Sequence, residues 1–74
     1  MSPIPVAAIY TKDGMRYPAV VRVHAHSLED ARQMTRIHLE CIALCDEGSV
    51  EFPTLDSLPD CFMRRWFMKK GVRN

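Results

Sequence analysis

Apolar and polar side chains alternate over residues 16–26. The odd-numbered positions from Tyr17 onward are apolar, and the even-numbered positions include Arg22, His24 and His26. A period of two residues is typical of a strand with one buried face and one mostly polar face. We therefore predict a strand here whose polar face carries Arg22, His24 and His26.

A second apolar run, residues 6–10, precedes this strand, and Asp13-Gly14 lies between the two. Asp-Gly tolerates positive φ and favours tight turns between antiparallel strands. Pro18 has no backbone N–H, so it places its strand at a sheet edge or marks the strand's beginning. Together these features predict an antiparallel β-hairpin.

A helix is predicted from Ser27 to Leu44 or Cys45. Ser27 can cap it by accepting a hydrogen bond from the backbone N–H of Asp30. Acidic side chains follow in the first turn, where the helix dipole favours them, and Gly48 stands just past the expected end.

The apolar arc of this helix is unusually wide. At 100° per residue it centres on Ala31, Met34, His38, Cys41, Ile42 and Cys45. Ile37, Leu39 and Leu44 widen it to more than half of the helix surface. One sheet face cannot cover so wide an arc. We expect either the C-terminal segment or a second subunit to cover the remainder.

The rest of the chain predicts a short third strand and a second helix. Residues 49–52 are the strand candidate, ended by Pro53. Residues 57–71 are the helix candidate, with a capping sequence that begins at Ser57, helical structure from Cys61 to Lys70 and Gly71 at its end. The predicted fold is one α+β domain over residues 1–74. It has a small antiparallel sheet in ββαβα order and helices packed on one face.

Length and composition favour binding over catalysis. A chain of 74 residues forms a small core that rarely encloses a deep pocket. The nucleophile-elbow, phosphate-loop and zinc-protease motifs are missing. We expect no enzymatic activity and no cofactor. Three cysteines, the lack of a secretory pattern at the N-terminus and the lack of a long apolar run indicate a cytoplasmic protein without a membrane partner.

Charge divides the chain into two parts. Residues 1–60 hold nine acids and five bases, which leaves −4, and residues 61–74 hold five bases and no acid. Such asymmetry indicates an acidic protein surface or a nucleic acid as the partner. The alternative is that the basic end folds back onto the acidic body or is simply solvated.

The basic end is the candidate recognition surface. Its charge comes from Arg64, Arg65, Lys69 and Lys70, and Trp66 is the candidate anchor. The two arginines are expected to matter more than the two lysines, because a guanidinium group can bind a carboxylate or phosphate bidentately. Further candidates for partner binding are Arg22, His24 and His26 on the hairpin. The alternative is a core helix whose aromatic side chains pack inward while its bases stay in water.

One further pattern suggests a metal. His38, Cys41 and Cys45 are zinc ligand types at helical spacing. The same positions centre the predicted core face, where free cysteine behaves as a small hydrophobe. We therefore assign no metal ligand, and a zinc-stabilised module stays a third hypothesis.

Residues 21–33 combine a strand end, a Ser-Leu cap and a helix that opens with acids and Ala-Arg. This pattern resembles small phage and mobile-element proteins, including some type I anti-CRISPR proteins. The resemblance implies a non-enzymatic inhibitor that occludes a host protein complex. The alternative function is a small nucleic-acid-binding regulator that uses the basic C-terminal helix. The wide apolar arc also predicts a homodimer, and the candidate contact residues are Ile37, Leu39, Leu44, Trp66 and Phe67.

Overall fold

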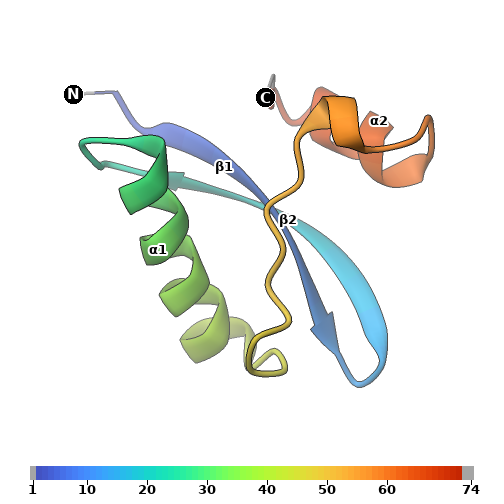
Figure 1. Cartoon of the computed structure of the whole chain (residues 1–74), viewed down its shortest axis with the longest axis horizontal. Coiled ribbons are helices and arrows are strands. Elements are labelled where there is room, and N and C mark those ends of the chain that lie inside the picture. The colour runs from blue at the N-terminus through green and yellow to red at the C-terminus, as the bar shows by residue number, and fades with distance from the viewer. Residues whose placement is uncertain (1, 73–74) are drawn as a thin grey trace.

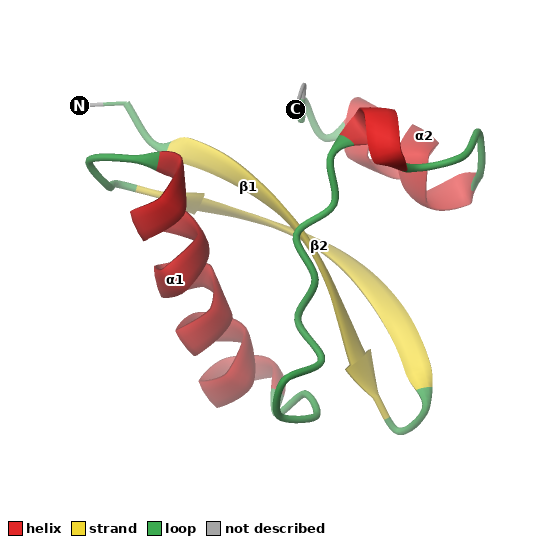
Figure 2. Cartoon of the chain, viewed as in Figure 1, coloured by secondary structure: helices red, strands yellow, loops and turns green. Residues whose placement is uncertain are grey.

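The computed structural model describes residues 2–72. The chain forms two strands followed by two helices, and the two strands pair as one antiparallel sheet (Figures 1 and 2). The elements are β1 (Ile4–Lys12), β2 (Met15–Val23), α1 (Leu28–His38), the π-helical turn η1 (Leu39–Ala43), the 3₁₀ turn η2 (Leu55–Ser57) and α2 (Phe62–Lys69). The α+β class is confirmed, with the order ββαα in place of ββαβα.

The predicted hairpin is present. Asp13 and Gly14 form its turn with φ of 53° and 78°, as a two-residue turn with positive φ at both positions requires. Next to the turn, Tyr10 pairs with Tyr17 and their rings stack with centroids 5.4 Å apart. β2 ends at Val23, so His24 and His26 follow the strand instead of lying on its face as predicted.

The two helices cover opposite faces of the hairpin. Val6 and Ala8 belong to clusters with α1 and η1, through Ala31 and Leu39 respectively. Ala7 and Ile9 point the other way, into a cluster with Phe67 of α2 and with Val72. The prediction of both helices on one face is wrong. Four consecutive buried residues, 6 to 9, give β1 two apolar faces, and each needs its own cover.

Ser27 caps α1 as predicted, because its Oγ accepts a hydrogen bond from the N–H of Asp30 at 3.2 Å. Helical structure continues through η1 and ends at Leu44, which has φ of 53°. The predicted end of the helix is therefore correct.

The buried face of α1 differs from the predicted one. Ala31, Thr35 and Leu39, spaced by four residues, face the hairpin, and the Thr35 hydroxyl donates to the Ala31 carbonyl at 2.7 Å. Met34, His38, Cys41 and Ile42 are exposed instead. The π-helical turn has more residues per turn than an α-helix, so Cys41 and Ile42 rotate away from the 100° projection. Met34 and His38 precede this turn and lie outside the narrow stripe that is buried.

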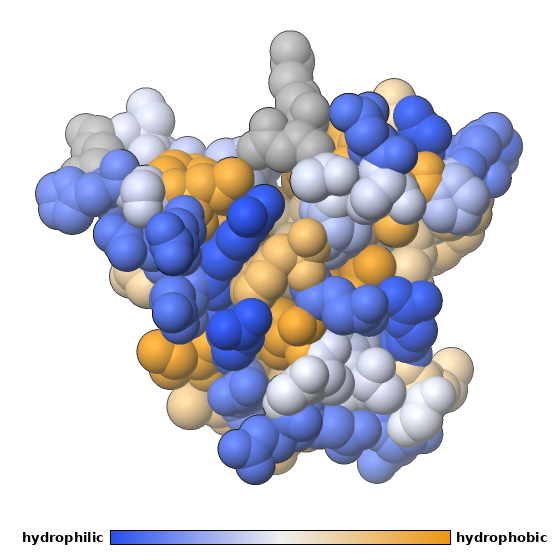
Figure 3. Space-filling view, viewed as in Figure 1, coloured by the Kyte–Doolittle hydropathy of each residue, from blue (hydrophilic) through white to orange (hydrophobic). Residues whose placement is uncertain are grey.

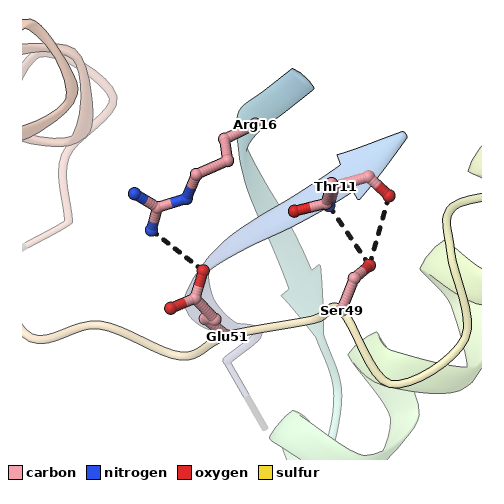
Figure 4. A network of polar contacts seen from close by, with 4 residues as sticks. All are labelled: Thr11, Arg16, Ser49 and Glu51. Carbon is pink, nitrogen blue, oxygen red and sulfur yellow. Dashed lines mark hydrogen bonds and ion pairs between the residues drawn. The ribbon is translucent and has the colours of Figure 1, made fainter. Parts of the chain in front are cut away.

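The predicted third strand reduces to one bridge. Ile9 and Glu51 exchange two backbone hydrogen bonds of 2.8 and 2.7 Å. A continued antiparallel ladder would pair Ala7 with Pro53, which has no N–H to donate. On the other side of the bridge, the Ser49 hydroxyl accepts from the N–H of Thr11 and donates to its carbonyl, both at 3.2 Å (Figure 4). These bonds hold the segment between η1 and η2 along β1.

Candidate interaction surface

α2 is held against the hairpin by Phe67, which is fully buried. Leu55 and Leu58, in the segment before the helix, pack on the same cluster. The helix spans Phe62–Lys69, close to the predicted helical span of Cys61 to Lys70. Its N-cap is Cys61 and not Ser57 as predicted, because Ser57 belongs to η2, where its hydroxyl donates to the Thr54 carbonyl at 2.8 Å. Gly71, with φ of 87°, lies just past its end. The C-terminal helix is thus partly a core helix, as the alternative interpretation held.

Two of the predicted recognition residues bond within the chain. Arg64 is half-buried and donates through Nη1 to the Leu58 carbonyl at 3.3 Å. Arg65 is exposed and forms an ion pair with Asp60, Nε to Oδ1 at 3.2 Å. An exposed pair of this kind contributes little stability, but it offsets the charge of Arg65 toward a partner.

The other predicted basic residues meet at the C-terminal end of α2. Lys69 and Lys70 are exposed, and the Lys70 ammonium lies 5.4 Å from the centroid of the half-buried Trp66 ring. Arg22, from β2, donates through Nη2 to the Lys70 carbonyl at 3.3 Å. The fold therefore joins residues 48 positions apart into one basic surface. We call Arg22, Trp66, Lys69 and Lys70 the Arg22–Lys70 corner.

The helix end itself adds to the electrostatics of this corner. The last carbonyls of a helix carry partial negative charge and favour cations. Arg22 uses this by bonding to the Lys70 carbonyl, while the Lys69 and Lys70 ammonium groups stay accessible. His24 and His26, grouped with Arg22 in the sequence, are exposed in the connection between β2 and α1. Arg73, counted in the basic end, lies outside the described residues.

Apolar side chains are exposed elsewhere on the surface. Phe62 and Met68 are exposed on α2, although Phe62 was predicted in the apolar stripe with Phe67. A second group, formed by Met34, Ile37, Ile42 and Leu44, lies on α1 and at its end. In the space-filling view, apolar surface lies over α1 and in the middle of the face, between hydrophilic residues (Figure 3).

The zinc hypothesis gains no ligand cluster. Cys41 is exposed and Cys45 is buried, so the predicted set points in different directions. Within residues 2–72, no three His, Cys, Asp or Glu side chains are grouped in a way that could hold a metal ion.

Neither described helix is long and apolar enough to cross a membrane. Comparison of the chain with protein-family models, with curated proteins and with solved structures found no match.

Proposed function

We propose that this chain is a small non-enzymatic interaction protein that binds an acidic surface of a protein partner through the Arg22–Lys70 corner. The observation that carries the proposal is the joining of Arg22 with Lys70, whose ammonium group lies over the Trp66 ring; the exposed Lys69 adjoins Lys70 in the chain. Charge concentrated in this way steers association with an opposite charge, and a partly exposed aromatic ring supplies apolar contact area.

This assignment changes which basic residues matter most. Arg64 and Arg65 already bond to Leu58 and Asp60, whereas the ammonium groups of Lys69 and Lys70 have no hydrogen bond or ion pair within residues 2–72. The two lysines therefore supply the accessible charge. Arg22 adds to it because it is exposed, although it donates to the Lys70 carbonyl, whereas Arg64 is half-buried. The resemblance to small phage and mobile-element proteins supports a specific version of the proposal, in which binding occludes a host protein complex.

Trp66 makes the proposal testable because it is the only tryptophan in the chain. Titration with poly-L-glutamate should change its fluorescence, and the affinity should fall as salt is raised. Lys70→Glu should weaken binding by about threefold to tenfold, mainly through slower association. Lys12→Glu is the matched control, since it makes the same charge change near the hairpin turn. Equal affinity of Lys70→Glu and Lys12→Glu would show that the surface lies elsewhere.

A second candidate function is single-stranded nucleic acid binding. The observation in its favour is the same Trp66 ring, since bases stack on aromatic side chains flanked by cations. An oligonucleotide that binds more tightly than poly-L-glutamate at equal salt, with a steep salt dependence, would favour this function over the first.

A further inference from the structure

The sheet has one edge with open backbone groups, and it belongs to β2. On the other edge, Ile9 of β1 turns its N–H and C=O outward to Glu51. In an antiparallel pair the two groups of one residue point to the same side, and this side alternates along the strand. Ile9 pairs with Pro18, so Pro18 and the other even-numbered residues of β2 also turn away from β1.

These outward groups are not used by the rest of the fold. Arg16, Pro18, Val20 and Arg22 make no backbone hydrogen bond to another segment within residues 2–72. Arg16, Val20 and Arg22 thus offer both a donor and an acceptor along the edge, and Pro18 offers a carbonyl. Such a row is a template for an added strand.

Charge decides which strand fits. β2 contains Arg16 and Arg22 and no acid. A second copy paired antiparallel across this edge would bring arginine toward arginine, and like charges opposite one another destabilise a sheet. An acidic segment would bring opposite charges together. The Arg16–Glu51 ion pair does not prevent this, because 54% and 57% of the two side chains are exposed and such a pair is easily exchanged.

We infer that the open edge of β2 binds an extended acidic segment of the partner protein as an added strand. This rests on the proposed function and deepens it. Arg22 belongs both to the edge and to the Arg22–Lys70 corner, so a strand along β2 would lead an acidic chain directly to Lys69 and Lys70. The backbone would supply affinity and the arginines would select acidic side chains.

The test is amide exchange measured by NMR on the full chain, with and without a peptide of alternating Glu and Val. Bound peptide should slow the exchange of the outward amides of Arg16, Val20 and Arg22. These amides alternate along β2 with amides that are already protected by hydrogen bonds to β1. Protection confined to α1, or none at saturating peptide, would overturn the inference. The inference would also be overturned if, without peptide, protection of the β2 edge amides increased with protein concentration, because a second copy of the chain would then be the strand that binds there.

A proline variant provides a second test. Val20→Pro removes an outward N–H without removing a hairpin bond, and Pro18 shows that this edge accommodates proline. Val20→Pro should lower the affinity for the Glu-Val peptide about tenfold, because it removes one hydrogen-bond donor and blocks the edge. Val20→Thr keeps the N–H and should bind the peptide as tightly as the parent chain does. Titration of Val20→Pro with poly-L-glutamate separates the two proposals, because this variant changes the β2 edge and keeps the side chains of the Arg22–Lys70 corner. If Lys70 remains necessary for poly-L-glutamate binding but the edge amides stay unprotected, only the edge inference fails. The amide exchange test uses the parent chain, so its result does not depend on whether Val20→Pro folds.

Discussion

Phe67 is the side chain that fixes α2 to the hairpin. It is the largest fully buried side chain among the described residues, and it contacts the face of β1 that α1 does not cover. Removing a buried phenylalanine ring leaves a cavity and costs about 3–5 kcal/mol. A domain of this length has an unfolding free energy on the order of 4–11 kcal/mol, so the loss is large.

We therefore expect Phe67→Ala to lower the urea midpoint sharply, as followed by circular dichroism. Phe62→Ala is the matched control, because it makes the same change in the same helix at a side chain that is 72% exposed. The control should change stability by no more than about 0.5 kcal/mol. Equal midpoints for the two variants would contradict the placement of α2.

The sequence shows which residues are basic, but it does not show which of these side chains are accessible to a partner. Residue type alone ranks Arg64 and Arg65 above Lys69 and Lys70, because a guanidinium group can bind a carboxylate or phosphate bidentately. This order changes only when Leu58 and Asp60 come within bonding distance through the irregular segment before α2. A loop of that kind has no periodicity to read, so sequence patterns could not have placed it.

Helix α1 and the turn that follows it show a conflict between local preference and fold. Leu44 ends the helical segment with φ of 53°, a left-handed conformation that costs a residue with a Cβ about 1–2 kcal/mol. Glycine escapes that cost but loses more backbone entropy on folding, about 0.5–1 kcal/mol. The Leu44 side chain is 70% exposed, so little burial is lost with it.

Leu44→Gly should accordingly stabilise the protein by about 0.5–1 kcal/mol. Thermal and urea unfolding would measure the gain, at a protein concentration low enough to keep the chain monomeric, because Leu44 belongs to the exposed apolar group on α1 and at its end. Leu44→Ala removes the side chain but keeps the Cβ, and should give no such gain. If the alanine and glycine variants unfold alike, the left-handed end of the helix is not strained.

Element positions were predictable where local chemistry decides them. The Asp13-Gly14 turn and the Ser27 cap each depend on residues within a few positions, and both are correct. The prediction of a third strand was wrong because the length of a strand depends on its pairing partner. Pro53 would lie opposite Ala7, and its missing N–H prevents the ladder from continuing there. The predicted face of α1 was wrong because only the narrow stripe of Ala31, Thr35 and Leu39 is buried, which leaves the apolar Met34 exposed. After Leu39, η1 also departs from the 100° periodicity on which the projection relied.

For the molecule as a whole, the placement of the two helices on opposite faces of the hairpin leaves part of the apolar arc of α1 uncovered. α2 cannot cover the wide apolar arc of α1, since it lies across the hairpin from it (Figure 1). The uncovered stripe consists of Met34, Ile37, Ile42 and Leu44. The prediction that Leu39 and Phe67 belong to the contact is wrong, because both are buried within the chain. Covering it with solvent alone is unfavourable, so the predicted homodimer remains the expected association.

A second copy of α1 also suits this stripe electrostatically. The first turn of α1 is acidic, with Glu29 and Asp30, and its last turn is basic, with Arg36 and His38. Two copies related by a two-fold axis with α1 antiparallel would bring the acidic turn of each toward the basic turn of the other. The dimer should therefore weaken as salt is raised, although burial of the stripe supplies most of its stability.

Sedimentation velocity at high micromolar concentration tests this prediction. We expect the parent chain to sediment as a dimer and Ile37→Glu as a monomer, because the substitution would bury an unpaired carboxylate in the contact. Met15→Glu is the matched control: Met15 and Ile37 are both 61% exposed, but Met15 lies at the hairpin turn, away from α1. The control should remain dimeric. A parent chain that stays monomeric throughout, or a Met15→Glu variant that dissociates as readily as Ile37→Glu, would refute a dimer formed through α1. In either case the amide pattern at β2 would still report independently on the open edge, because the two surfaces share no residue.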